Sequence, residues 1–192
     1  MINIVLFGPP GSGKGTQAKF LEEKFNLKQL STGDMFRYNM KNETELGKLA
    51  QSYINKGHLV PDEVTTDMLR QELKLHTGFA GYIFDGYPRT TAQAKSLDEI
   101  LKEDLNDSVS VTLSLKVEDE ILVQRLLERG KESGRADDAN EAVIRDRITE
   151  YYTKTDEVAE HYKAQGKYVE INGVGEIAEI TAKLTAEIEK VI

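Results

Sequence analysis

The stretch FGPPGSGKGTQ at residues 7–17, directly after the apolar run INIVLF, constrains the fold more than any other part of the chain. Gly8, four further residues, and then Gly13 and Lys14 have the spacing of a P-loop between a predicted strand and a predicted helix. Glycines let the backbone curl until several N–H groups face one anion, and the helix N-terminus adds partial positive charge. The spacing therefore predicts a triphosphate-binding loop at the end of the first strand.

The residue after Lys14 narrows the class of P-loop protein. P-loop proteins that bind magnesium directly carry a Ser or Thr hydroxyl at this place. This chain has Gly15 there, and the hydroxyl follows on Thr16. The loop alone leaves GTPases, ATPases, motors and small-molecule kinases open, and an ordinary Gly-rich turn is the alternative to a phosphate site.

The remainder of the chain alternates short apolar runs with longer segments of helical periodicity. The predicted strands are 2–7, 28–30, 82–84, 109–115 and 168–171. The predicted helices are 14–25, 33–40, 45–55, 62–75, 91–105, 118–129, 141–164 and 176–191. Such alternation indicates an α/β protein with a mainly parallel sheet and helices on both of its faces.

Two segments do not fit a plain strand–helix alternation. About fifty residues separate the second and third predicted strands, which is more than one crossover helix requires and suggests an inserted helical subdomain. The segment RGKESGRADDAN at 129–140 interrupts two helical segments with two glycines and mixed charges, as a solvated surface turn would. The length of 192 residues favours one domain that contains both features.

Charge and composition exclude several classes of partner. The formal net charge of -8 argues against nucleic acid or an anionic membrane surface as a partner. The chain has no cysteine, so disulfides, thiolate metal sites and cysteine nucleophiles are excluded. No apolar run approaches the roughly 18 residues of a membrane helix, and the N-terminus leads straight into a strand. We expect a cytoplasmic protein that holds anions with a local cluster of cations.

Two further stretches place ligand-type side chains at predicted strand ends. STGDMFR at 31–37 follows the second strand; Ser31 or Thr32 can cap the next helix, whereas the guanidinium of Arg37 suits a phosphate. IFDGYPRT at 83–90 puts Asp85 where ligands bind in open α/β sheets. A carboxylate there can hold the water shell of a magnesium ion, and a helix or turn cap is the alternative.

The motifs GPPGSGKGTQ, STGDMFR, LVPDE, DGYPRT and SGRADD follow the order and spacing of adenylate kinases, and the resemblance covers essentially the whole chain. Glycine followed by threonine, at Gly15 and Thr16, is that family's own form of the P-loop. The resemblance implies a P-loop three-layer fold with a central five-stranded parallel sheet. It also implies a core of 1–30, 61–129 and 140–192, a nucleotide-monophosphate-binding insertion at 31–60 and a short lid at 130–139.

The same resemblance implies residues for each ligand. The implied ATP-binding residues are Pro10, Gly11, Ser12, Gly13, Lys14, Gly15, Thr16, Arg125, Arg129 and Gly175. The implied AMP-binding residues are Thr32, Gly33, Arg37, Leu59, Val60, Gly86, Arg89, Gln93, Arg135 and Arg147. The cations expected to act on the transferred group are Lys14, Arg89, Arg125, Arg135 and Arg147. Asp85 is expected to hold Mg²⁺ through water, and Arg145 to form only a surface salt bridge.

The activity that the resemblance implies is Mg²⁺-dependent, reversible phosphoryl transfer from ATP to AMP, which gives two ADP. Water competes as acceptor, so the lid and the insertion should close first, with Asp137 and Asp138 anchoring the closed lid to arginines or to the nucleotide. The short lid and the absence of cysteine argue against the zinc that some family members hold, and the resemblance implies a monomer.

Two other functions remain open at this stage. A UMP/CMP kinase would share the fold, but such relatives typically carry Asn after the Phe-Pro-Arg turn, where this chain has Thr90. A P-loop switch that hydrolyses ATP slowly and signals through a partner would need no second-nucleotide motif. The stretches 31–37 and 86–93 therefore argue against the switch.

Overall fold

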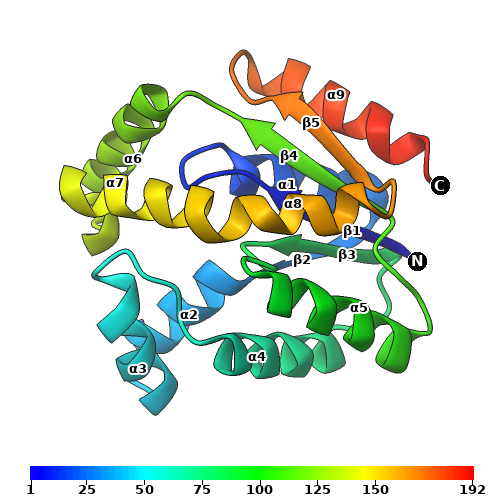
Figure 1. Ribbon diagram of the computed structural model, residues 1–192, viewed down its shortest axis with the longest axis horizontal. Helices are drawn as coiled ribbons and strands as arrows, with labels where there is room; N and C mark the ends of the chain where they lie inside the picture. The colour runs from blue at the N-terminus through cyan, green and yellow to red at the C-terminus, as the bar shows by residue number, and fades with distance from the viewer.

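Five parallel strands form one sheet in the order β2-β3-β1-β4-β5 (Figure 1). The strands are β1 (Ile2–Phe7), β2 (Leu27–Ser31), β3 (Gly81–Asp85), β4 (Val111–Lys116) and β5 (Tyr168–Asn172). The computed structural model describes the backbone of residues 1–192 and every side chain except that of Asp156. The predicted α/β class and the five predicted strands are confirmed, although the fourth strand begins at Val111 and not at residue 109.

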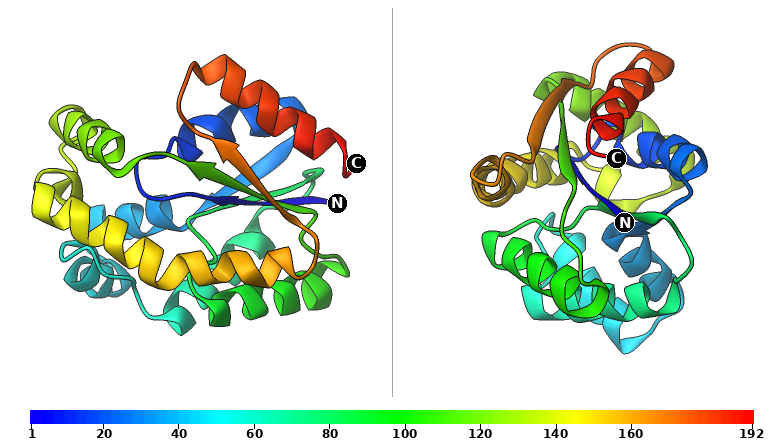
Figure 2. Two further views of the ribbon diagram at one scale, coloured as in Figure 1. Left: turned by 45° about the horizontal axis from the view of Figure 1, so that its top comes forward. Right: turned by 90° about the vertical axis from the view of Figure 1, so that its right-hand side faces the viewer.

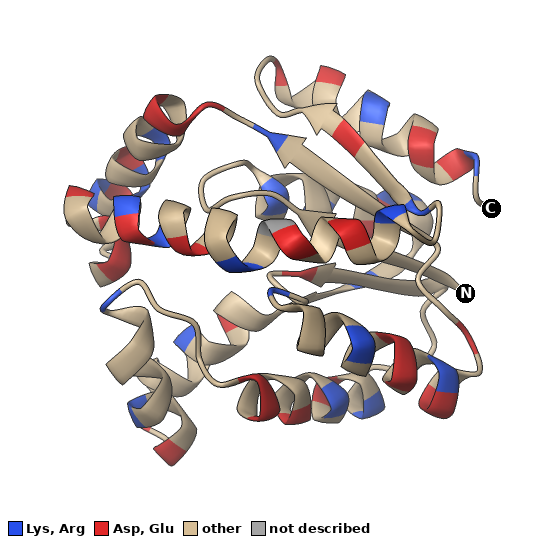
Figure 3. Ribbon diagram, viewed as in Figure 1, with Lys and Arg blue, Asp and Glu red and all other residues tan. Residues whose placement is uncertain are grey.

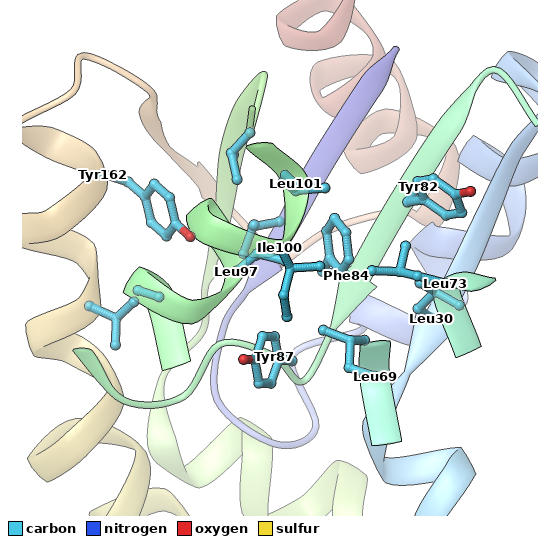
Figure 4. Packing of buried hydrophobic residues seen from close by; sticks show 14 of the residues in the cluster. Leu30, Leu69, Leu73, Tyr82, Phe84, Tyr87, Leu97, Ile100, Leu101 and Tyr162 are labelled. Atoms are coloured by element: carbon cyan, nitrogen blue, oxygen red, sulfur yellow. The ribbon is translucent and has the colours of Figure 1, made fainter. Parts of the chain in front are cut away.

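Helices cover both faces of the sheet. On one face lie α4 (Asp62–Leu75), α5 (Thr91–Leu105) and α8 (Asp156–Lys163), whose apolar side chains pack on Val5, Phe7 and Phe84 (Figure 4). On the other face lie α1 (Lys14–Phe25) and α9 (Ile177–Glu189), packed on alternate residues of the same strands (Figure 2). Strands buried on both faces produce the continuous apolar runs that mark a parallel sheet in sequence.

The long connection between β2 and β3 forms α2 (Thr32–Lys41), α3 (Glu45–Ile54) and α4. Ser31 and Thr44 cap α2 and α3 by accepting hydrogen bonds from the backbone N–H groups of Asp34 and Gly47. Phe36, Ala50 and Val60 belong to an apolar cluster of their own, separate from the two clusters on the sheet. The extra residues of this connection therefore build a helical unit beside the carboxyl ends of the strands.

The segment after β4 differs from its prediction in two places. Helix α6 (Asp119–Ser133) runs four residues beyond the predicted end at 129, because Gly130 does not break it. A Cβ at Gly130 would lie 2.5 Å from the backbone O of Asp138, so this glycine serves a close approach of two segments. The short turn η1 (Ala136–Asp138) follows α6.

The predicted helix 141–164 is wrong as one continuous α-helix. It comprises α7 (Glu141–Glu150), a π-helical turn η2 (Tyr151–Thr155) and α8. Thr155 is buried in this wide turn, and its hydroxyl donates to the backbone O of Arg89 at 3.0 Å. The turn thus couples this long helical segment to the loop after β3. In the described part of the chain, no helix has the length and apolar character needed to cross a bilayer.

Candidate functional site

A cleft of about 960 Å³ lies at the carboxyl ends of the strands, and segments from the whole chain line it. In Figure 1 this is the side on which α6 and α7 extend past the sheet toward α2 and α3. Every predicted site residue except Gly175 lines this cleft. Ile177 and Ile180, at the start of α9, line it in place of Gly175.

The P-loop joins β1 to α1 at the base of the cleft. Gly13, immediately before α1, has φ 97°, a conformation that L side chains rarely adopt. A Cβ there would meet nothing within 4 Å, so backbone conformation and not crowding is what requires glycine at this position. Lys14 folds back over the loop, and its Nζ donates to the backbone O of Gly8 at 2.6 Å and of Pro9 at 3.0 Å. The Lys14 side chain therefore helps to hold the backbone of the loop in its curved conformation.

The pKa of Lys14 is lowered to about 8, mainly because burial disfavours the charged amine. The negative charge of Asp85 opposes this effect, whereas Arg89, Arg147 and Arg129 reinforce it. Burial likewise lowers the pKa of Arg89, and the neighbouring charge of Arg147 lowers it further. These cations repel one another and are partly removed from water. A bound anion offsets both effects and therefore stabilises the charged form of each side chain. The charge pattern therefore suits a highly charged anionic ligand.

Arg89 and Thr32 meet at the loop after β3. The Nε of Arg89 donates to the backbone O of Gly86 at 2.8 Å, and the Thr32 hydroxyl donates to the same oxygen at 2.9 Å. A Cβ at Gly86 would lie 3.0 Å from both side chains, and its φ is 77°. Glycine therefore lets the ends of β2 and β3 present two polar groups to one point in the cleft.

Asp34 connects the two arginines that face the cleft from opposite sides. Arg37 Nη2 donates to Asp34 Oδ1 at 2.6 Å, and Arg135 Nη2 lies 3.8 Å from the same oxygen. Asp34 belongs to α2, whereas Arg135 lies in the segment between α6 and η1. Helix α2 and the segment between α6 and η1 line the cleft from two sides, and they approach each other at the carboxylate of Asp34.

Two aspartates that follow α6, Asp137 and Asp138, bind the side chains of Arg129 and Arg147. Asp138, with 0% of its side chain exposed, accepts from Arg129 Nε at 2.7 Å and from Arg147 Nη1 at 2.7 Å. Asp137 Oδ2 lies 3.0 Å from Arg147 Nη1. These hydrogen bonds outweigh burial and keep the pKa of Asp138 below its ordinary value. Asp137 and Asp138 thus bind arginines of α6 and α7, and that they anchor a closed lid, to arginines or to the nucleotide, stays a prediction.

The two remaining arginines of this region differ in their surroundings. Arg125 Nη1 donates to the backbone O of Gly173 at 3.4 Å and to that of Gly11 at 3.5 Å, so it weakly bridges the loop after β5 and the P-loop. Arg145 forms ion pairs with Glu120 and Glu141 on the surface, as predicted.

In Figure 3, acidic and basic residues both occur along α4, α5 and α9, so these helices present no extended basic face.

Asp85 is the carboxylate placed best for a magnesium ion. It ends β3, is 8% exposed and lines the cleft. A Cβ at Gly15 would lie 3.8 Å from Asp85 Oδ2, so a Ser or Thr at position 15 would occupy the space that glycine leaves beside this carboxylate. Among the described side chains, no group of three or more His, Asp or Glu could hold a metal. One carboxylate with room for water fits Mg²⁺, which usually keeps several waters and binds substrate phosphates.

Two residues of this network were not singled out from the sequence. Gln29 on β2 donates from Nε2 to Asp85 Oδ2 at 2.9 Å. Asp62, in the LVPDE stretch, accepts from Thr90 and Gln93. Both pairs join positions that are distant in sequence, so no local pattern marks them, although β2 and β3 pair in register at their carboxyl ends.

Comparison with known proteins gives a consistent result. A family model described as adenylate kinase matches residues 6–167. The adenylate kinase of Flavobacterium johnsoniae is 57% identical over 189 residues, which are 98% of this chain and 99% of that protein. That of Parabacteroides distasonis is 50% identical over 191 residues, covering 100% of both chains. That of Bacteroides fragilis is 51% identical over 175 residues, covering 91% and 92%. The similarity spans the strands and the cleft alike.

Proposed function

The chain belongs to the adenylate kinase family and is a phosphotransferase, and we propose that its cleft holds ATP and AMP together and converts them reversibly into two ADP. The observation that carries this proposal is the pair of cationic walls around one cleft. The P-loop with Lys14 forms one anion site, and Arg37 with Arg89 forms a second beside β3. A nucleotide switch would need only the first site.

We assign the nucleotides to the two walls on this basis. ATP phosphates would occupy the P-loop, with Arg125 and Arg129 beside them and the adenine near Ile177 and Ile180. AMP would occupy the opposite wall, which comprises Thr32, Gly33, Arg37, Leu59, Val60, Gly86, Arg89 and Gln93. Arg135 and Arg147 would face the phosphates between the two nucleotides. Gly175, which the resemblance placed beside ATP, lies outside the cleft lining.

The reaction requires little covalent chemistry from the protein. A phosphate oxygen of AMP forms a bond to the γ-phosphorus of ATP, and the bond from that phosphorus to the β,γ-bridging oxygen breaks, so both products are ADP. The nucleophile is already an anion, so no general base is needed. Catalysis then rests on in-line placement and on stabilising the charge of the transferred group. The half-buried cations for this role are Lys14, Arg89, Arg125, Arg135 and Arg147.

Asp85 would hold magnesium through its water shell, beside the gap at Gly15. When bound, the ion neutralises charge on the ATP phosphates. The contribution of the chain is to orient the carboxylate, through the hydrogen bond from Gln29, and to keep the space next to it open.

Water exclusion requires parts of the cleft to move. We propose that the lid, 130–139, and the insertion, 31–60, close over the core once both nucleotides are bound. The contact of Arg135 with Asp34 already joins these two segments. We further propose that the protein acts as a monomer in the cytoplasm, without a nucleic-acid or membrane partner.

A coupled assay tests the proposal. Purified protein with MgATP should form ADP with AMP and much more slowly with UMP, CMP or GMP. ADP formation at an equal rate without any acceptor would contradict the kinase assignment. Arg89→Ala should lower turnover by several orders of magnitude while the protein remains folded, because this cation acts mainly in the transition state. Arg70→Ala, which breaks only an exposed pair with Glu103 and Asp104, is the matched control and should leave turnover unchanged.

A further inference from the structure

Asp62 is tied to the proposed AMP wall by both of its carboxylate oxygens. Its Oδ1 accepts from Gln93 Nε2 at 2.8 Å, and its Oδ2 accepts from the Thr90 hydroxyl at 2.8 Å. Asp62 is the first residue of α4, whereas Thr90 and Gln93 lie at the start of α5. The two helices are thus joined through one acidic side chain at the edge of the cleft.

A purely local role does not account for this arrangement. Asp62 could serve the N-terminus of its own helix, because acidic residues are favourable in the first turn. However, the residue at the cap is Pro61, and α4 has no side-chain cap hydrogen bond. The Asp62 hydrogen bonds go instead to two side chains 28 and 31 residues away in sequence. The carboxylate is therefore used to orient its partners on α5.

The Gln93 amide is held at both ends. Its Nε2 donates to Asp62, and its Oε1 accepts from the backbone N–H of Arg89 at 2.7 Å. An ionised carboxylate can only accept and a backbone N–H can only donate, so the amide cannot turn over without facing like groups at both ends. Gln93 is 2% exposed and lines the cleft, with one N–H and one lone pair left for a ligand.

The orientation of this amide decides which base it can pair with. The 6-position and N1 of adenine present a donor and an acceptor, whereas those of hypoxanthine and guanine present an acceptor and a donor. An amide in one orientation matches the first pattern, and the same amide turned over matches the second. We propose that Asp62 is a positioning residue that fixes the Gln93 amide in the orientation for adenine and thereby sets the preference for AMP over 6-oxopurine monophosphates. This inference rests on the proposed function.

The test compares AMP with IMP, which has nearly the same shape and the opposite hydrogen-bond pattern. Asp62→Asn keeps the size of the side chain but replaces one acceptor oxygen with a donor. That donor can face Gln93 Oε1 once the amide has turned over, so the turned amide meets a like group at only one end, the backbone N–H of Arg89. We expect the ratio of kcat/KM for AMP to that for IMP to fall about tenfold or more. A change of this size is what the loss of one buried hydrogen bond to a charged group produces. The KM for ATP should not change.

Controls separate positioning from folding. Asp67→Asn alters an exposed aspartate on the same helix and should leave the AMP-to-IMP ratio unchanged. Asp62→Glu keeps two acceptor oxygens and should retain more of the preference than Asp62→Asn. If Asp62→Asn lowers kcat/KM equally for both nucleotides, or lowers only the melting temperature, the positioning role is wrong. Should that variant fail to fold, Asp62→Ala replaces it, because it also removes the acceptor of the Gln93 bond; an AMP-to-IMP ratio equal to that of the unaltered protein would contradict the positioning role.

The failure of the inference can be told apart from that of the proposed function. If the unaltered protein forms no ADP from MgATP and AMP, the proposed function fails. If it does so and Gln93→Ala leaves the KM for AMP unchanged, the assignment of Gln93 to the AMP wall fails. If Gln93→Ala raises that KM and Asp62→Asn leaves the AMP-to-IMP ratio intact, only the role of Asp62 is contradicted.

Discussion

At the scale of single residues, Lys14 is a cation partly withdrawn from water among other cations, so its charge depends on its ligand. In the ligand-free protein its pKa is lowered to about 8, chiefly by burial. A bound triphosphate favours the charged amine and raises that pKa. Below pH 8 the amine is charged in both states, and above pH 8 binding must restore its proton. We therefore expect ATP affinity to decrease by up to about tenfold per pH unit above pH 8.

Calorimetry checks this pH dependence directly. Titrations at pH 9 in buffers of different ionisation enthalpy should show uptake of up to one proton when ATP binds, and little uptake through this group at pH 7. Lys14→Met should bind ATP more weakly and lose the uptake at pH 9. If the variant takes up as many protons as the unaltered protein, another group is responsible.

Gln29 acts one step away from the proposed magnesium site. Removing its hydrogen bond with Gln29→Leu frees the Asp85 carboxylate to turn, so more Mg²⁺ should be needed for half-maximal activity, by about tenfold. The KM for AMP should stay within twofold. Equilibrium binding of ATP with and without Mg²⁺ gives a readout that is independent of turnover. Gln51→Leu, at an exposed position on α3, controls for a general effect of the substitution.

The residues that the sequence identified lie in short continuous motifs, such as the P-loop and STGDMFR. Gln29 and Asp62 act through partners on other elements. Gln29 and Asp85 are 56 residues apart, and only the pairing of β2 with β3 brings them together. A single sequence, considered without an alignment, contains no local pattern that marks such pairs. This part of the site could therefore be identified only from the structure.

At the scale of elements, the segment between α6 and α7 is held to the core by buried charges. Asp138 satisfies Arg129 and Arg147 at once, so Asp138→Ala leaves both cations without this partner. Arg129 is 37% exposed and Arg147 keeps its contact with Asp137, so the loss of this acceptor should cost about 1–3 kcal/mol. We expect a loss of roughly this size in the free energy of unfolding, measured by chemical denaturation.

The exposed ion pairs of Arg145 with Glu120 and Glu141 provide a control for the effect of Asp138→Ala on the free energy of unfolding. Glu120→Gln removes one of its two exposed ion pairs and should change the free energy of unfolding by less than about 1 kcal/mol. If the two substitutions destabilise the protein equally, Asp138 does not anchor the segment in the way described.

Helix ends were predicted less well than helices. Gly130 and Gly134 both suggest a break in sequence, but only Gly134, with φ 67°, ends α6. Gly130 is needed because the backbone of Asp138 passes close to it, which depends on tertiary packing. The π-helical turn between α7 and α8 likewise goes with a tertiary contact, since the Thr155 hydroxyl donates to the backbone O of Arg89.

At the scale of the whole molecule, the fold class followed from the alternation of strands and helices, because burial of both sheet faces imposes a pattern that is visible without tertiary information. The apolar runs of β1 and β3 supply residues to both clusters that flank the sheet. The cleft forms where the carboxyl ends of β1, β2 and β3 meet the two outer segments, 31–60 and 130–139. Its position is thus a property of topology, whereas its charge pattern belongs to individual side chains.

The proposed closure of the two outer segments predicts which step limits turnover. If the lid must open before ADP leaves, kcat should decrease in proportion to solvent viscosity when sucrose is added, because opening and product release displace solvent. A polymer that raises bulk viscosity with little effect on small-scale motion should have far less effect. Arg89→Ala supplies an internal control. In that variant phosphoryl transfer itself should be slow, so its kcat should no longer depend on sucrose. A kcat of the unaltered protein that is independent of sucrose would show that opening is not limiting, and dependence in both proteins alike would point to an effect of sucrose on the fold.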